Sequence, residues 1–461
     1  MDSESMSFLD ANYLLTTPVA RRIFDGISAL PIIDAHNHCD VKALSEDRNF
    51  TDIWDAEAAT DHYVWEVMRK CGVPEEYITG QDRTNREKWN ALAGVFELVA
   101  GNPTYEWIHL DLKRRLGIDL EINAGNADAI WEESRRRLQL PEFSQQSLIL
   151  AMNVERMCST DDPVDTLECH RKLADSRLAG RVRPTFRPDA AVNIDKPSWN
   201  AYLDRLGARW NVAIRDLPSF LAALQQAHDC MEELGCRASD HGIMLPEGYQ
   251  IDRDRAEAIF AKARGGNKVS ADEIRDFKAW CLNEVAEMDA RSGWVFQIHY
   301  GAVRDVRDRL YNALGADVGG DVAEHSFAVV QPLIPFLNRF DSRLKVVLYN
   351  MNPAHNATLA TLSRAFGSTV SLGSAWWLND SYAGMKNQLE IGASIDLLGN
   401  MSGMVSDSRK ILSYGSRFEM YRRTLSEVLG GMVGRGQMPE TVAARLARRI
   451  AYDRPKELFG M

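Results

Sequence analysis

The stretch PIIDAHNH, residues 31–38, decides the fold, because a short apolar run ends in two alternating histidines. Residues i and i+2 of an extended strand face the same side, so His36 and His38 point together from the end of this strand. Two imidazoles on one face are candidate ligands for a divalent metal such as Zn. The alternative is a pair of inert, hydrogen-bonded histidines. A place at the end of the first strand of a barrel favours the metal.

Similar short runs rich in Val and Ile alternate with polar helical stretches along the rest of the chain. The candidate strands lie at 31–36, 154–159, 181–187, 236–241, 294–299, 345–350, 368–373 and 400–407. Strands separated by helices favour parallel βα units, and a set of this size predicts a (β/α)8 TIM barrel of the α/β class. We predict one such barrel over residues 1–461 rather than several domains.

Two segments are too long to be simple loops between a strand and a helix. Helical periodicity over about 50–147 predicts a helical insertion after the first strand, at the catalytic end of the barrel. A smaller helical insertion is expected at about 245–292, where Ser270 is a candidate helix cap.

Barrel closure would bring a carboxylate to the two histidines, since the last strand of a closed barrel lies beside the first. Asp407, at the end of the candidate strand 400–407, can then meet His36 and His38. It could ligate a metal and accept a proton, or it could simply cap the next helix. His241 and His299 also end candidate strands, and either could complete the metal shell or contact the substrate.

Two arginines stand at the ends of candidate strands. Arg187 ends the strand predicted at 181–187, and Arg409 follows the strand predicted at 400–407. The guanidinium group binds a carboxylate at two points, which a lysine cannot do. Each arginine could equally form a structural ion pair.

Aromatic side chains supply the remaining candidates. Trp376, in AWWLND at 375–380, could cover a sugar or pack in the core. His62 and Tyr63 lie in the first helical insertion and could reach over the barrel mouth, or could be purely structural.

The composition excludes several classes of protein. Lys and Arg number 54 against 65 Asp and Glu, so the net charge of −11 argues against nucleic acid as a partner. Seven cysteines without CxxC spacing indicate reduced thiols, as expected in the cytoplasm. The acidic start, MDSESMSFLDANYLL, does not resemble a signal peptide. No apolar run approaches the ~20 residues of a membrane span, so we expect no membrane partner.

Ordered blocks over nearly the whole chain resemble the uronate isomerase (glucuronate isomerase) family of the amidohydrolase superfamily. The matching blocks are FLDANYLLTTPVARRIF, PIIDAHNH, TDHYVWEVMRKCGV, GNPTYEWIHLDLKRRLGI, STDDPVDTLECH, TFRPD, SDHG, QIHYGAVR, GADVG, YNMNP, GSAWWLND and GMVSDSRKILSY. The most specific are TDDP, WWLND and SDSR. The chain departs from the family pattern in three places: Glu66 replaces a basic residue, Ser406 replaces a frequent Thr, and CDVKALSEDRNF at 39–50 lacks the proline pair that is common after the two histidines.

The resemblance implies a distorted (β/α)8 barrel with a helical insertion after strand 1, in a protein that we expect to be a homo-oligomer. It implies one divalent metal ion, for which zinc is our choice, held by His36, His38 and Asp407. The same resemblance gives catalytic roles to Asp407, Arg409, Tyr63 and His62, and substrate binding to Arg187, Trp376 and His299.

The implied reaction is the interconversion of aldose and ketose forms of a sugar acid: D-glucuronate to D-fructuronate, and D-galacturonate to D-tagaturonate. A proton moves between C2 and C1 through an enediol, which requires a base and stabilisation of the oxygen anion. Either Asp407 or Tyr63 could move that proton, while Arg409 polarises the oxygens and Arg187 clamps the far carboxylate.

Two other functions fit the same residues. A metal-dependent hydrolase, such as a sugar-acid lactonase, would use the site to activate water. Hydrolases of this superfamily more often carry a modified Lys or a Glu on strand four, where this chain has Asp240 and His241. A sugar-acid binder without activity would not need Asp407 and Arg409 together.

Overall fold

Parallel strands form the centre of the molecule. The computed structural model describes residues 7–324 and 326–461. Its strands are β1 (Ile32–Asp34), β2 (Val154–Cys158), β3 (Val182–Arg183), β4 (Ala238–Ile243), β5 (Val295–Tyr300), β6 (Ala302–Val303), β7 (Val322–Ala323), β8 (Lys345–Asn350) and β9 (Val370–Leu372). One parallel sheet has the order β1-β2-β3, and a second has the order β4-β5-β8-β9. These sheets confirm the α/β class.

Backbone contacts connect the two sheets at both of their edges. Phe186 pairs with Asp161 and Ser239, which joins the region after β3 to β4. On the other side the segment 402–408 bridges β9 and the residues after β1. The amide of Ser402 donates to the carbonyl of Leu372 (2.8 Å), that of Asp407 to His36 (3.2 Å), and that of His38 to Ser408 (3.0 Å). Residues 36–38 and 407 therefore lie side by side.

The strand predicted at 400–407 does not form. Residues Leu398–Asn400 make a 3-10 turn, and the backbone after them contains two residues with positive φ, Gly403 at 88° and Asp407 at 49°. A strand requires negative φ throughout. The Pro455 ring also lies 2.8 Å from the position of a Cβ on residue 403, so only glycine fits there. This segment carries hydrogen bonds to both neighbours without being a regular strand.

One further strand prediction needs correction, and one pair of strands was not predicted. The strand expected over 181–187 is limited to β3, because the amide of Thr185 donates to the side-chain Oδ2 of Asp161 instead of continuing the ladder with β2. The antiparallel hairpin of β6 and β7 had no counterpart in the sequence prediction.

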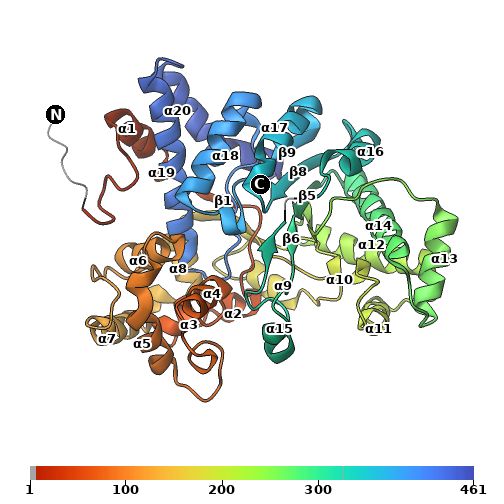
Figure 1. Ribbon diagram of the computed structural model, residues 1–461, viewed down its shortest axis with the longest axis horizontal. Helices are drawn as coiled ribbons and strands as arrows, with labels where there is room; N and C mark the ends of the chain where they lie inside the picture. Colours follow the sequence, from red (N-terminus) through yellow and green to blue (C-terminus); the bar gives the residue numbers. More distant parts are fainter. Residues whose placement is uncertain (1–6, 325) are drawn as a thin grey trace.

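Helices surround the sheets (Figure 1), and they fall into three groups along the chain. Those preceding β2 are α1 (Pro18–Ile27), α2 (Val41–Glu46), α3 (Ile53–Glu57), α4 (His62–Lys70), α5 (Asn85–Val95), α6 (Pro103–Arg114), α7 (Ala127–Leu138) and α8 (Gln145–Ala151). Those between β2 and β5 are α9 (Glu168–Ala174), α10 (Asp189–Val192), α11 (Trp199–Trp210), α12 (Leu217–Glu233), α13 (Arg253–Arg264) and α14 (Ala271–Ser292). Figure 1 shows α5–α7 on one side of the strands and α11–α14 on the other.

The remaining helices follow β6. They are α15 (Asp308–Leu314), α16 (Val330–Phe340), α17 (Asn356–Ala365), α18 (Tyr382–Ile395), α19 (Ser413–Gly434), α20 (Glu440–Arg448) and α21 (Arg454–Leu458). Ser270 caps α14 as expected: its hydroxyl accepts from the amide of Glu273, whose carboxylate accepts from the amide of Ser270. Over the described part of the chain, we find no helix with the length and apolar character needed to cross a bilayer.

Candidate functional site

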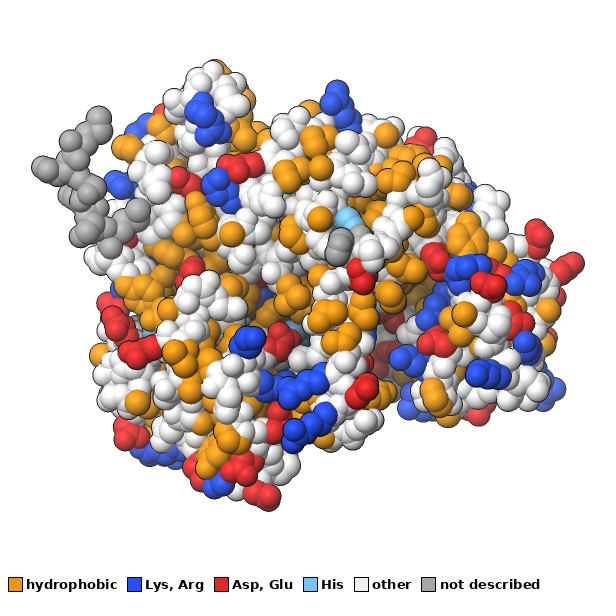
Figure 2. Space-filling model, viewed as in Figure 1, with side chains coloured by type: hydrophobic (Ala, Val, Ile, Leu, Met, Phe, Trp, Pro, Cys, Tyr) orange, Lys and Arg blue, Asp and Glu red, His pale blue; other side chains and the backbone are white. Residues whose placement is uncertain are grey.

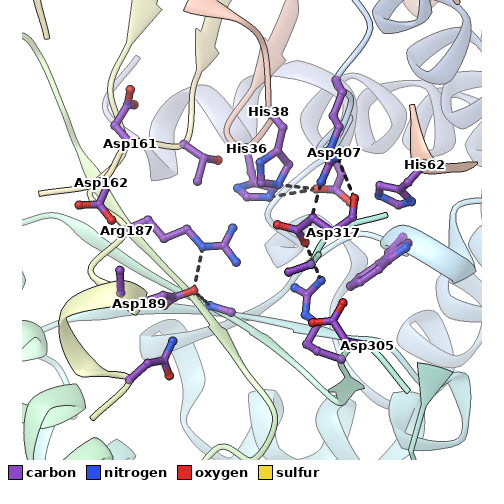
Figure 3. A pocket seen from close by; sticks show the side chains of 18 of the residues that line it. His36, His38, His62, Asp161, Asp162, Arg187, Asp189, Asp305, Asp317 and Asp407 are labelled. Carbon is purple, nitrogen blue, oxygen red and sulfur yellow. Dashed lines mark hydrogen bonds and ion pairs between the residues drawn. The ribbon is translucent and has the colours of Figure 1, made fainter. Parts of the chain in front are cut away.

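Two histidines and one carboxylate converge at the carboxyl end of β1. The Nε2 atoms of His36 and His38 lie 3.1 and 3.3 Å from the same oxygen, Oδ1 of Asp407. Figure 3 shows the three side chains pointing toward one another at the edge of a cavity. The side chain of His36 is 1% exposed and that of His38 is 30% exposed, so the cluster is buried at His36 and accessible at His38. The structure therefore brings together the three residues that the sequence predicted as a group.

Asp407 reaches this position because its backbone is held in the left-handed region. The preceding residue, Ser406, donates twice to Asp34: its amide to Oδ1 at 2.9 Å and its hydroxyl to Oδ2 at 2.6 Å. Its carbonyl accepts from Nη1 of Arg417 at 3.0 Å. The amide and the carbonyl of Ser406 are thus both held by buried charged groups. The strained φ of 49° at Asp407 persists because these contacts determine it.

Arg417 is itself held by the WWLND block. Its Nη1 lies 2.8 Å from Oδ2 of Asp380, and its guanidinium lies 3.9 Å from the ring centre of Trp107 and 5.0 Å from that of Tyr63. Arg417 and Asp380 are 1% and 2% exposed, and burial raises the pKa of Asp380 to about 7. Isolated buried charges of this kind are costly unless they are paired. The WWLND and SDSR blocks are therefore structurally linked.

A second cluster shares His36. Asp240 on β4 lies 3.4 Å from Nδ1 of His36, 2.6 Å from Nδ1 of His299, and 3.0 Å from Nη1 of Arg187. Burial acts to raise the pKa of Asp240, but Arg187 and the two histidines outweigh it and hold that pKa well below its usual range. Burial lowers the pKa of His299 to about 4. Asp240 is thus an anion, and it orients both imidazoles.

The residues present fit a divalent metal ion. His36, His38 and Asp407 offer two nitrogens and one oxygen within 4.8 Å of one another, and His36, Asp240 and His299 form a second such set. Nε2 of His299 is buried and has no hydrogen-bond partner among the described side chains and backbone. A buried, unpaired imidazole nitrogen beside an N/N/O donor set is typical of a metal ligand sphere.

The clusters open into a cavity of about 450 Å³. It is lined by His36, His38, His62, Thr160, Asp161, Asp162, Arg187, Asp189, Ala190, Asn193, Lys196, Gly242, Arg304, Asp305, Ala316, Asp317, Trp376, Trp377, Asp407 and Arg409. Figure 3 shows Arg187 and Asp189 on one side of it and Asp407 and His62 on the other. A cavity of this size accommodates a six-carbon sugar acid.

Most of the predicted catalytic and substrate residues line this cavity, but Tyr63 and His299 do not. Tyr63 lies behind His62, which stacks on it with ring centres 4.6 Å apart, and its buried hydroxyl has no hydrogen-bond partner among the described residues. Burial, followed by the charge of Asp407, raises the pKa of Tyr63 well above its usual value. His299 lines an adjoining cavity, and its ring centre lies 4.7 Å from that of Trp376, which lines both cavities.

The sequence left open whether His241 or His299 lies beside His36, and the geometry of the strands distinguishes the two. His241 faces away from the metal-type clusters: its Nε2 lies 2.9 Å from Oγ of Ser239, and its ring stacks on Phe296. Its neighbour Asp240 points inward instead, because adjacent residues of a strand face opposite sides. His299, and not His241, therefore joins the cluster around His36.

Glu66 does not place a negative charge among the residues that line the cavity. Its Oε1 lies 3.2 Å from Nδ1 of His62, one helical turn away on α4. This pair orients the imidazole that does line the cavity. The departure from the family pattern at this position therefore acts on His62 rather than directly on a ligand.

A buried lysine next to Arg409 connects the site to the helices between β1 and β2. Nζ of Lys410 lies 3.0 Å from Glu57 at the end of α3 and 3.2 Å from Asp61, the N-cap of α4. All three residues are buried. This ion-pair group sets where α4, and with it His62, lies relative to Asp407.

Sequence reasoning missed several residues of the site. Asp240 was overlooked in favour of the adjacent His241, although the strand period would have placed only one of them inward. Arg304, Asp317 and Lys196 lie on irregular segments whose position in space no local pattern indicates. The TDDP block was recognised as specific, and it places Asp161 in the cavity wall, where burial raises the pKa of its carboxyl to about 7.

Parallel sheets with imidazoles and a carboxylate gathered at their carboxyl ends define an α/β protein with a metal-type site. The sequence model of the glucuronate isomerase family matches residues 6–459. The chain is 49% identical over 452 residues to the uronate isomerase of Thermotoga petrophila, an alignment that covers 98% of this chain and 99% of that protein. The chain therefore belongs to the glucuronate isomerase family and is an isomerase.

Solved structures agree with this assignment. The crystal structure of uronate isomerase from Thermotoga maritima matches with a TM-score of 0.96 at 48% identity, covering 98% of this chain and 100% of that one. Glucuronate isomerase from Caulobacter crescentus matches with a TM-score of 0.95 at 27% identity, covering 98% and 97% of the two chains. The resemblance stated from the sequence is confirmed.

Proposed function

We propose that the chain interconverts D-glucuronate with D-fructuronate, and D-galacturonate with D-tagaturonate, through an enediol. One observation carries the proposal. In a chain that matches the glucuronate isomerase family over residues 6–459, the imidazoles of His36 and His38, the carboxylate of Asp407 and the guanidinium groups of Arg187 and Arg409 are among the groups that line a single cavity. These groups supply a base, a positive charge at the reacting end and hydrogen-bond donors toward the rest of a six-carbon acid.

We propose that the two parallel sheets and the segment 402–408 together make a distorted (β/α)8 barrel that spans 1–461 as one domain. Hydrogen bonds from this segment to Leu372 and His36 support closure. Helices α3–α8 would be the insertion at about 50–147, and α13 and α14 the one at about 245–292. The site would then lie at the end of a barrel where active sites are found.

We further propose that the bound ion is zinc, held by His36, His38 and Asp407, with His299 beside it. Two imidazoles and a carboxylate are common zinc ligands, and three protein ligands leave one position open. Such an ion supplies Lewis acidity toward a sugar oxygen when bound. The expected cytoplasmic location, homo-oligomeric state and absence of nucleic-acid and membrane partners stay predictions.

Asp407 is the base in this proposal, because it lines the cavity whereas the hydroxyl of Tyr63 is enclosed behind His62. Asp407 takes the proton from C2 and returns it to C1, while the hydroxyl proton of O2 passes to O1, so that the aldehyde becomes an alcohol and C2 becomes the ketone. Arg409, two residues away, stabilises the negative charge that develops on the oxygens. His62 contacts the substrate, and Tyr63 holds its imidazole in place by stacking.

The opposite wall binds the rest of the sugar. Trp376 presents its indole beside His299, and the NH of that indole is buried without a partner among the described residues, so it is available to a hydroxyl group. Arg187 shares its guanidinium between Asp189 and Asp240. It therefore contributes hydrogen bonds to the substrate rather than a free positive charge.

The proposal is tested by NMR with D-glucuronate and D-galacturonate in D2O. We expect ketose formation with partial deuterium at the position that receives the proton, because the carboxylate can exchange its proton with solvent between the two steps. If both uronates stay unchanged while a sugar-acid lactone is opened, the chain is a hydrolase and the proposal is wrong.

A further inference from the structure

The cavity wall carries many acidic side chains for a site that takes an anion. Its carboxylates are those of Asp161, Asp162, Asp189, Asp305, Asp317 and Asp407. Its cations are Arg187, Lys196, Arg304 and Arg409. The chain as a whole has a net charge of −11. A carboxylate ligand is therefore attracted only by a cation that these acids do not already neutralise.

Two of the arginines are already paired. Arg187 lies 2.9 Å from Asp189 and 3.0 Å from Asp240, two carboxylates for one guanidinium. Arg304 lies 2.8 Å from Asp321 and 3.6 Å from Asp317, with its guanidinium 4.5 Å from the ring centre of Trp377. Neither arginine therefore has an uncompensated positive charge that could bind the carboxylate of a substrate.

Arg409 is less tightly paired, but it lies at the reacting end of the cavity. Its Nη1 donates to the carbonyl of Asp317 at 3.4 Å, and its Nη2 lies 4.0 Å from a carboxylate oxygen of the same residue. It follows Asp407 by two residues, so its charge acts where the proton moves. The distal carboxylate of an open-chain sugar acid needs another partner.

Lys196 is the candidate, because its charge acts on the carboxylates of Asp195 and Asp305 but it forms no ion pair with either. It lines both the main cavity and an adjoining cavity of about 370 Å³, and its side chain is exposed. Within residues 7–324 and 326–461, no carboxylate lies within 4.0 Å of its ammonium group. The nearest acid in sequence, Asp195, is taken by Lys278 at 2.7 Å.

We infer that Lys196 binds the carboxylate of the sugar acid and so selects uronates over neutral sugars. The inference rests on the proposed function, and it assigns to Lys196 the clamp that the sequence alone gave to Arg187. An ammonium group on a flexible stem tolerates the two C4 epimers, glucuronate and galacturonate, equally well. Because the substrate carboxylate takes no part in the proton transfer between C1 and C2, Lys196 binds the ground state and the transition state to the same extent.

The test compares kcat and KM for D-glucuronate in wild type, Lys196→Met and Lys196→Arg. We expect Lys196→Met to raise KM by about tenfold with kcat within about twofold, because uniform binding is lost. Lys196→Arg should restore KM to within about threefold, since the charge is kept. Added NaCl should raise KM of wild type more than that of Lys196→Met, because salt screens the attraction.

Lys268→Met is the matched control. Lys268 is exposed, lines neither cavity, and its loss changes the net charge by the same amount. Its KM and salt response should equal those of wild type. A KM of Lys196→Met within twofold of wild type, or a loss confined to kcat, would overturn the inference while leaving the isomerase intact. Failure of wild type to convert any uronate would instead overturn the proposed function, and this inference with it.

Discussion

Asp407→Asn is expected to lower kcat for D-glucuronate by about 10²–10⁴-fold, because an amide cannot take the proton from C2. The change also removes the oxygen anion that lies 3.1 and 3.3 Å from His36 and His38. An N/N/O set without its carboxylate binds zinc less tightly. We therefore expect reduced zinc content in the purified variant together with lost turnover, measured by ketose formation and by metal analysis.

The control for this variant is Asp128→Asn on α7, whose carboxylate is 74% exposed and pairs with Arg86 at the surface. It removes the same charge, and exposed ion pairs contribute little. It should retain wild-type kcat and zinc. If Asp407→Asn keeps near-normal turnover, Asp407 is not the base, and Tyr63 becomes the candidate.

Ser406→Val is expected to lower kcat by about 10²-fold, whereas Ser406→Thr stays within about threefold of wild type. Valine and threonine have the same shape, but only threonine keeps the hydroxyl that donates to Asp34 at 2.6 Å. Loss of that bond leaves a buried carboxylate short of a partner and releases one of the contacts that hold Asp407 at its positive φ. Displacements of about 1 Å at a reacting group cost this much in rate.

Thr424→Val tests whether such a loss is merely a stability effect. Thr424 is buried in α19, and its hydroxyl donates only to the carbonyl of Met420, at 2.8 Å. This variant should lose some thermal stability and keep kcat. Kinetics and thermal unfolding of all three variants, measured side by side, separate the two effects. Equal kcat values for Ser406→Val and Ser406→Thr would mean that the Asp34 contact does not position Asp407.

Local patterns predicted the parts of this site that depend on period. The alternation in PIIDAHNH placed His36 and His38 on one face, and the structure has both beside Asp407. Helix-capping chemistry likewise predicted Ser270 at the start of α14. The strand expected at 400–407 was wrong, because the conformations of Gly403 and Asp407 depend on partners that are distant in the sequence.

Electrostatic roles were harder to predict than positions. Arg187 was expected to hold the carboxylate of the substrate, and the sequence does not indicate that Asp189 and Asp240 both pair with it. Lys196 had no distinguishing motif, and its importance rests on Asp195 being paired with Lys278. Whether a charge is free depends on all of its neighbours in space.

By itself, the sequence determined the α/β class, the pair of imidazoles and the family, since these follow from periodicity along the chain and from ordered blocks of residues. The tertiary structure alone decided that Asp240 rather than His241 faces inward, that Asp407 adopts a left-handed backbone, and that Lys196 forms no ion pair with the described residues. The physical reason is that strand register, backbone strain and charge compensation are settled by contacts between segments that lie far apart in the chain.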